Sequence, residues 1–171
     1  MAVGQYCVFV VELELVDVRI DEVTKQPFLE LKASDGTNRV LPIAVGLPEG
    51  AAVKYGLEQR TTPRPMTHDL LGHILEACGA TLDQVVITDF HDQIYFAELH
   101  LSLGTDRKIV SCRPSDAVAL AVRVGASIFV NDEVLDRQGV LPSADEPAER
   151  GEELVDEFRK FIDDINPEDF R

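Results

Sequence analysis

The chain has 171 residues, 45% of them hydrophobic, which is enough to form one globular domain with a sizeable core. No apolar run reaches the ~18 residues that a membrane-spanning helix needs, and the first residues lack the pattern of a signal peptide. We therefore expect a cytoplasmic protein with no membrane contact. The net charge of −15 argues against tight binding of long nucleic acids, because such proteins usually present a basic face to phosphate.

The first 60 residues indicate three strands and one helix. Over 9–15, apolar and acidic residues alternate with the period of two that is typical of a half-buried strand. Strands are also expected over 28–31 and 39–45, on either side of the hairpin signal Asp35-Gly36. A helix is predicted over 48–58.

The middle of the chain predicts two helices and four strands. The helix over 68–78 has apolar residues at helical spacing and stops at Gly79, whereas the helix over 115–124 is apolar nearly all round and should be buried. The residues expected to be buried in the first of these helices are Leu70, Leu71, Ile74, Leu75 and Cys78. The strands are expected over 84–90, 94–103, 108–112 and 128–130. This order predicts an α+β fold with helices packed on a largely antiparallel or mixed sheet.

The composition changes after Leu141. Residues 142–147 indicate a linker, which divides the chain into a domain over 1–141 and a tail over 142–171. An amphipathic helix is predicted in the tail from its apolar residues, which are Leu154, Phe158, Phe161, Ile162 and Ile165. Such a stripe needs an apolar surface to cover, and the long strand expected over 8–18 leaves an edge that needs covering too. We therefore expect a homo-oligomer, most simply a two-fold dimer.

The three cysteines are Cys7, Cys78 and Cys112. Their odd number and wide spacing fit neither a disulfide framework nor a zinc site, and they lie in apolar runs. We expect buried, reduced thiols.

Two segments begin with the same Arg-Pro pair. They are Arg64-Pro65-Met66-Thr67-His68-Asp69-Leu70-Leu71 and Arg113-Pro114-Ser115-Asp116-Ala117-Val118-Ala119-Leu120. In each, a hydroxyl residue (Thr67 or Ser115) stands where it could cap the helix, and an arginine (Arg64 or Arg113) precedes it. Because first-turn amides and the helix dipole favour negative charge, the two segments predict an anion site shared by both arginines.

These segments resemble the bifunctional nuclease (BFN) domain family. The resemblance also includes Leu41-Pro42-Ile43-Ala44-Val45-Gly46 with Glu49, and Val86-Ile87-Thr88-Asp89 before Tyr95-Phe96-Ala97-Glu98-Leu99. It runs in matching order from about Val8 to Val134, and it implies cleavage of DNA or RNA, an activity ascribed to some plant members.

If this resemblance extends to activity, the chemistry would be acid–base or metal-assisted hydrolysis of phosphodiesters. His68 would act as the base, while Asp69 and Asp116 would orient groups or bind a metal. A divalent metal is one way to activate water, and the acidic candidates for its ligands are Glu49, Asp69, Asp89 and Asp116. A further candidate set on one helix face is Asp69, His73 and Glu76, for which a solvated face is the simpler interpretation. The sequence identifies no cofactor.

A second interpretation makes the domain a non-catalytic, oligomeric binding module. Each arginine would pair with a nearby acid such as Asp69, Asp116 or Glu49, and would lock a helix start or hold a small anionic ligand. The charge favours this interpretation, because the tail carries −7 and the other 141 residues carry −8. Only 6% of the residues are aromatic, so few side chains are available to stack on bases.

Overall fold

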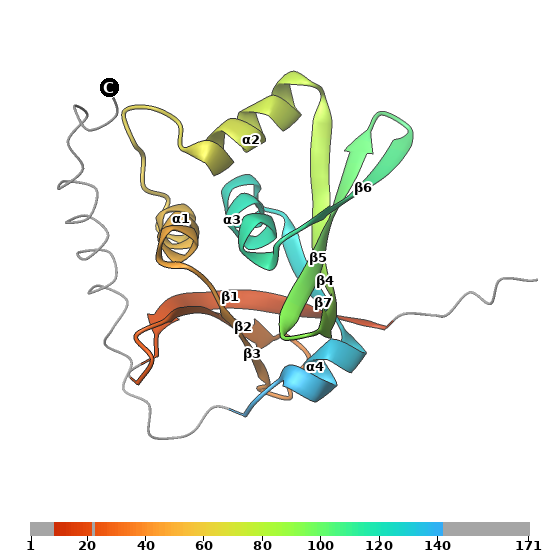
Figure 1. The fold of residues 1–171 in the computed structure, drawn as a ribbon. Helices are drawn as coiled ribbons and strands as arrows, with labels where there is room; N and C mark the ends of the chain where they lie inside the picture. Colours follow the sequence, from red (N-terminus) through yellow and green to blue (C-terminus); the bar gives the residue numbers. More distant parts are fainter. Residues whose placement is uncertain (1–8, 22, 142–171) are drawn as a thin grey trace, which may run out of the picture.

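The computed structural model describes residues 9–21 and 23–141. The expected tail helix, the linker and Cys7 lie outside these residues, so the predictions made for them stay predictions. Within the described part, seven strands and four helices follow the order that Figure 1 shows.

One mixed sheet contains all seven strands. In chain order they are β1 (Val10–Ile20), β2 (Pro27–Ala33), β3 (Val40–Ala44), β4 (Ala80–His91), β5 (Ile94–Leu103), β6 (Asp106–Cys112) and β7 (Ser127–Asn131). Across the sheet the order is β3-β2-β1-β7-β4-β5-β6, and neighbouring strands are antiparallel except for the parallel pair β4 and β7. The predicted α+β class and mixed sheet are therefore confirmed. β1 lies inside the sheet, so the expectation that it leaves an open edge was wrong.

The central strand β7 joins two antiparallel groups of strands. It returns after β6 and α3 to lie between β1 and β4, with Val130 opposite Val11 and Ile128 opposite Val85. The side-chain amide of Asn131 donates to the carbonyl of Thr88 at 2.6 Å, which adds a link between the ends of β7 and β4.

Three helices lie together on one side of the sheet: α1 (Leu47–Leu57), α2 (Thr67–Ala77) and α3 (Pro114–Val124) (Figure 1). The fourth, α4 (Asp132–Gln138), follows β7 directly and lies at the lower end of the sheet in that view. Sequence analysis missed α4, because seven residues are too few to show a helical period. Its buried residues, Val134 and Leu135, complete the core at this end.

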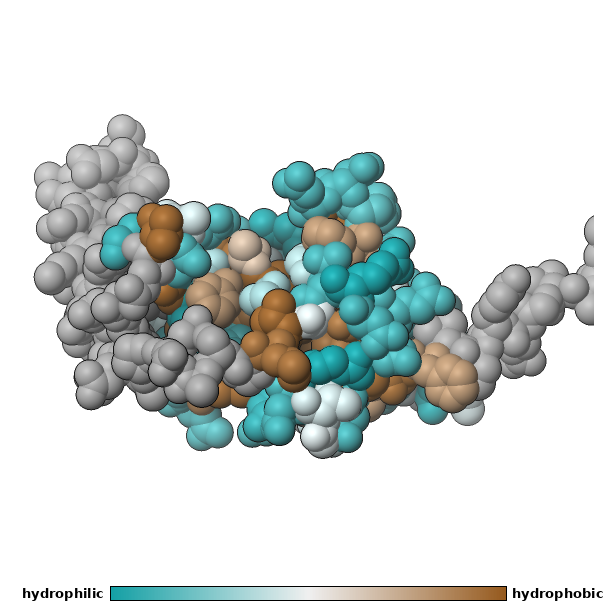
Figure 2. All heavy atoms as spheres, turned by 90° about the horizontal axis from the view of Figure 1, so that it is seen from below, coloured by the Kyte–Doolittle hydropathy of each residue, from teal (hydrophilic) through white to brown (hydrophobic). Residues whose placement is uncertain are grey.

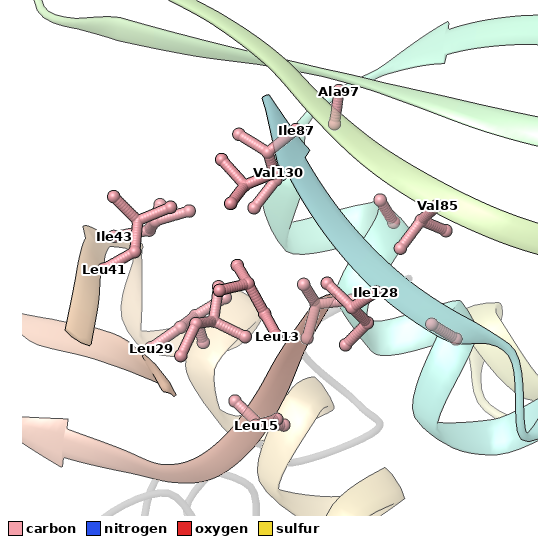
Figure 3. Packing of buried hydrophobic residues seen from close by; sticks show 14 of the residues in the cluster. Leu13, Leu15, Leu29, Leu41, Ile43, Val85, Ile87, Ala97, Ile128 and Val130 are labelled. Atoms are coloured by element: carbon pink, nitrogen blue, oxygen red, sulfur yellow. The ribbon is translucent and has the colours of Figure 1, made fainter. Parts of the chain in front are cut away.

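The core lies between the sheet and the helices. As expected, α3 is buried over most of its surface, and Ala117 to Ala121 form an unbroken buried run. Figure 3 shows Leu13 and Leu29 from the N-terminal strands in one cluster with Val85 and Ile128. Residues far apart in the sequence thus hold the three helices in fixed positions.

A β-bulge ends the simple alternation in β1. Leu13 and Leu15 are buried, but the next buried residue is Val18, because the register with β2 shifts between Leu15 and Asp17. The extra residue turns the following side chains over. The carboxylate of Asp17 therefore lies near α1, where it accepts a hydrogen bond from Nζ of the buried Lys54 at 2.5 Å.

α2 differs most from its prediction. Leu75 packs against the core, but no residue of this helix is fully buried. Leu70, Leu71 and Ile74 are 51%, 40% and 48% exposed, and Cys78 is also exposed. The spacing predicted the helix correctly, but the expectation that its apolar residues are buried in the same domain was wrong. This exposed side of α2 is called the α2 ridge below.

The face seen from below in Figure 2 carries apolar and hydrophilic atoms side by side. Phe9 and Leu141, at the ends of the described chain, are among the most exposed large apolar residues. None of the helices in the described residues is long and apolar enough to cross a membrane.

Candidate functional site at three helix starts

Each of the three neighbouring helices carries an acid at its third position. Glu49 is the third residue of α1, Asp69 of α2 and Asp116 of α3. A carboxylate in the first turn is favoured by the helix dipole and by the unpaired amides there. The two Arg-Pro segments therefore match each other at their aspartates, although Pro65 precedes its helix and Pro114 begins one.

Arg113 links two of these acids. It holds Asp116 through two parallel hydrogen bonds, from Nε to Oδ2 at 2.8 Å and from Nη2 to Oδ1 at 3.0 Å. Its Nη1 atom donates to Oε1 of Glu49 at 3.1 Å. Hydrogen bonds from Arg113 hold the pKa of the Asp116 carboxyl below its usual value, although partial burial opposes this shift. The arginine thus clamps the start of α3 to the start of α1.

His68 links the start of α2 to the start of α3. Its Nε2 atom lies 3.4 Å from Oδ1 of Asp116, and its side chain is only 12% exposed. The contacts therefore run from Glu49 through Arg113 and Asp116 to His68, and they connect the first turns of all three helices.

Asp69 has a different partner from its neighbour His68. Its Oδ1 atom accepts a hydrogen bond from Nε of Arg123 at 2.5 Å, and its Oδ2 atom accepts one from the amide of Met66 at 2.8 Å. Burial raises the pKa of Asp69, but these two hydrogen bonds outweigh burial and hold the pKa below its usual value. Because Arg123 also donates to the carbonyl of Ala119 at 2.8 Å, Asp69 ties α2 to α3 through a contact separate from that of His68.

Thr67 and Ser115 do not cap their helices. The cap residues are Met66 and Arg113, and neither the Thr67 nor the Ser115 hydroxyl is the cap of its helix. Ser115 is the second residue of α3 because Pro114 occupies the first position, where a missing N–H leaves no hydrogen bond unmade. In α2 the Asp69 carboxylate bonds back to the cap amide instead. The capping role expected of both hydroxyl residues was therefore wrong.

Arg64 and Asp89 lie apart from these contacts. Arg64 is exposed, and within the described residues its guanidinium has no hydrogen-bond or ion-pair partner. No contact joins it to Arg113, so a shared anion pocket stays a prediction. Asp89, near the end of β4, lies 3.2 Å from Nδ1 of the exposed His91.

The acidic candidates do not form a metal site. Among the residues that the structure describes, no group of three or more His, Cys, Asp or Glu side chains is arranged to hold a metal ion. Glu49 and Asp116 share Arg113, Asp69 bonds to Arg123, and Asp89 pairs with His91. These side chains do not fit a resident divalent ion as they stand, so no step of the proposed reaction uses one.

Two cavities flank the cluster. One, of about 310 Å³, opens beside the clamp, and its lining includes Gly46, Glu49, Gln93, Tyr95, Arg113 and Ser115. The other, of about 570 Å³, lies beside α2, and its lining includes Arg60, Thr62, His68, His73, Glu76 and Arg123. His68 therefore lines the larger cavity while its Nε2 atom faces Asp116.

Sequence analysis missed Arg123. This arginine is only 10% exposed, and it fixes α2 through Asp69. A basic residue near the end of a helix is usually explained by the helix dipole, so the sequence contains no signal for this contact. Gly56 of α1 leaves the space for it, because a Cβ there would lie 2.6 Å from Nη1 of Arg123.

Comparison with known proteins identifies the family. The family model of the bifunctional nuclease domain matches residues 28–143. An uncharacterised protein of Mycobacterium tuberculosis (strain H37Rv) is 38% identical over 165 residues, which cover 94% of this chain and 98% of that protein.

Plant proteins match over a smaller part of their length. Bifunctional nuclease 1 of Arabidopsis thaliana is 30% identical over 66% of this chain and 35% of its own length. Bifunctional nuclease 1 of Oryza sativa subsp. japonica is 26% identical over 77% of this chain and 41% of its own length. The family match spans β2 to α4 and includes all three helix starts. The chain therefore belongs to the bifunctional nuclease domain family.

Proposed function

We propose that this chain is a nuclease that hydrolyses phosphodiester bonds of DNA or RNA, with His68 as its general base. The observation that carries the proposal is that His68 contacts Asp116 through Nε2 and also lines a cavity of about 570 Å³. Membership of the family and the names of the plant relatives support the same reaction class.

In this proposal the histidine and the aspartate have complementary roles. With the Nε2–H of His68 directed at Asp116, Nδ1 is the nitrogen that is free to accept a proton. Asp116 would fix the ring and stabilise its protonated form, as a carboxylate does in other histidine-dependent hydrolases. Because Arg113 keeps this carboxyl ionised, Asp116 stays available as the acceptor.

In the proposed reaction, Nδ1 of His68 removes a proton from water while the water oxygen attacks phosphorus. The bond from phosphorus to the leaving oxygen breaks, and the proton held by His68 passes to that oxygen. The products are a phosphate monoester and a free hydroxyl, and His68 returns to its neutral form.

Arg64 is the better phosphate ligand of the two Arg-Pro arginines. Arg113 uses three of its five N–H groups on Asp116 and Glu49, and these three side chains together carry a net charge of −1. Arg64 has no such partner within the described residues. Arg113 would therefore act mainly through Asp116, and could offer its remaining two N–H groups to the substrate.

The test is cleavage of single- and double-stranded DNA and RNA by purified protein, with and without divalent ions. His68→Gln should lower the rate at least ~100-fold, which is the low end for loss of a general base. His100→Gln is the matched control, since His100 also lies 3.4 Å from a carboxylate, that of Glu98. An Arg64→Ala/Arg113→Ala variant should lose activity as well. Activity that survives in His68→Gln would show that His68 is not the base.

The pairing of Arg113 with two acids also favours the second candidate function, a non-catalytic binding module. In that case the clamp joins α1 to α3 and stabilises the fold. A purified wild-type protein that cleaves none of the four substrates under any ion condition would select this function over the nuclease.

A further inference from the structure

The sheet has two edge strands that differ in how they are protected. At one edge, β3 has only five residues and contains Pro42, which lacks a backbone donor. Val40 and Val140 also exchange two backbone hydrogen bonds of 2.8 Å, which cover part of this edge. These are the features by which proteins prevent another strand from pairing with an edge.

The opposite edge, β6, has no proline and no covering bridge in the described structure, although Arg107 and Lys108 place charges along it. Its ladder with β5 is regular from Cys112 opposite Ala97 to Asp106 opposite Leu103, with no bulge and no proline. Six of its seven residues are exposed, and Cys112 is half-buried. One side of the β6 backbone is therefore a straight row of donors and acceptors open to another strand.

β6 also exposes apolar side chains on both of its faces. Ile109 is 61% exposed and Val110 is 45% exposed, and neighbouring residues of a strand point to opposite faces. Val110 lies opposite Leu99, which packs against the core, so Val110 is on the helix-covered face. Ile109 is on the other face.

The chain connects the α2 ridge to the strands that lead to this edge. α2 ends at Ala77, Ala80 pairs with Leu103 of β5, and Leu103 pairs with Asp106 of β6. Leu103 is itself 44% exposed. The helix-covered side of the sheet thus has exposed apolar side chains on β6, on β5 and on α2.

We propose that β6 is the interface of a homodimer, in which a second copy of this chain pairs its own β6 antiparallel to the first. The two-fold axis passes beside Ile109 and runs perpendicular to the sheet. The two sheets then continue as one, and both sets of helices lie on the same face.

Charge is compatible with this register of the two β6 strands and disfavours two others. Pairing Ile109 with its own copy sets Lys108 opposite Val110 and Arg107 opposite Ser111, so no like charges face each other directly. Pairing centred on Lys108 would set two lysines opposite each other, and pairing centred on Arg107 would do the same with two arginines. Because one strand is short of the ~20–30 residues a side that a stable interface uses, the proposed interface also includes exposed side chains beyond β6 on the shared face.

A second copy suits this edge better than the expected tail helix does. An open strand edge is satisfied by the backbone of another strand, whereas a helix uses its backbone groups internally. The tail also follows Leu141, beside the protected β3 edge and six strand positions away from β6.

The experiment uses the full chain with its three cysteines changed to serine. Directly opposed residues of an antiparallel pair have Cβ atoms about 4.5–5.5 Å apart, so Ile109→Cys should form a disulfide-linked dimer under mild oxidation. Ile94→Cys is the matched control, because Ile94 is 57% exposed but lies at the start of β5, and it should remain unlinked.

Light scattering of the natural sequence at micromolar concentration should give twice 18.9 kDa. Ile109→Lys should give the monomer mass with an unchanged far-ultraviolet circular dichroism spectrum, whereas Val23→Lys, at a side chain 90% exposed on the β1–β2 turn, should stay dimeric. A wild-type monomer would overturn the proposal. A dimer that persists in the Ile109→Lys variant would overturn it as well. If Phe158→Glu abolishes that dimer, the tail and not β6 forms the interface.

Discussion

Nε2 of His68 in α2 lies 3.4 Å from Oδ1 of Asp116 in α3, although 48 residues separate them in the sequence. This contact makes the two Arg-Pro segments neighbours in space. It also connects a titratable ring to a carboxylate that Arg113 already holds with two hydrogen bonds. The same contact can serve a general base or stabilise a helix start.

Acid should weaken the fold through Asp116 and Asp69. Hydrogen bonds from Arg113 lower the pKa of Asp116 in the folded state, and hydrogen bonds from Arg123 and Met66, against the effect of burial, lower that of Asp69. Both carboxylates therefore stabilise the fold fully above the ordinary value of 3.8, and this stabilisation is lost as pH falls through the lower folded-state pKa values.

Urea unfolding at pH 5 and at pH 3 would measure this loss. Asp116→Asn and Asp69→Asn should each reduce the difference between the two midpoints. Asp92→Asn is the control, because Asp92 lies in the exposed β4–β5 turn with a positive φ that asparagine also adopts. An unchanged pH difference in both test variants would contradict the prediction.

Replacing Arg123 should destabilise the protein by about 1.5–3 kcal/mol, the range for hydrogen bonds to charged groups. Arg123→Met keeps the apolar stem but leaves the half-buried Asp69 carboxylate without its side-chain partner. Arg137→Met should change stability by less than about 0.5 kcal/mol, since Arg137 is 59% exposed and lies away from the helix starts. Chemical denaturation of both variants compares them, and equal midpoints would refute a role for Arg123 in fixing α2.

Two helical glycines should respond to alanine in opposite directions. At Gly56, a Cβ would lie 2.6 Å from both Nη1 of Arg123 and Cγ2 of Val122, so Gly56→Ala should cost about 1–3 kcal/mol through overpacking. At Gly72, the nearest atom would be Cγ1 of Val124 at 3.4 Å, an ordinary contact. Gly72→Ala should therefore stabilise by roughly 0.5–1 kcal/mol. Thermal unfolding would detect both shifts, and a destabilised Gly72→Ala would mean that α2 and α3 pack more tightly than their contacts indicate.

Local patterns predicted the elements well but not their partners. The alternation in β1, the Asp35-Gly36 turn and the apolar run of α3 each reflect a local period, and the structure has all three elements. The bond from Arg123 to Asp69 depends on how α2 crosses α3, which no local period encodes. The predicted burial of the α2 ridge was wrong for a related reason. Spacing identifies an apolar face of a helix, but it does not show whether the same domain covers that face.

For the candidate site, too, the sequence indicated the residues but not all of their partners. His68, Asp116 and Arg113 were identified from the Arg-Pro echo, and they do touch. The contact of Arg113 with Glu49 of α1 was only one of several pairings that the sequence allowed. Which carboxylate pairs with an arginine depends on distances of a few ångströms between helices. The packing of the core beneath the helices sets these distances.

Cys78 and Cys112 should differ in reactivity, contrary to the expectation that both thiols are buried. Cys78 is exposed just beyond the end of α2, whereas Cys112 is half-buried at the end of β6. Burial raises the pKa of Cys112 to about 11, and the nearby carboxylates of Asp116 and Glu98 add to this shift. Because the thiolate is the reactive form, alkylation of Cys112 should be slow at pH 8 and should keep accelerating up to pH 10.

Mass spectrometry of a Cys7→Ser variant treated with iodoacetamide would follow Cys78 and Cys112 separately, and the denatured wild-type protein should yield three alkylated thiols. Equal rates at pH 8 for the folded variant would show that Cys112 is not protected, and a disulfide under non-reducing conditions would refute the reduced state of the cysteines.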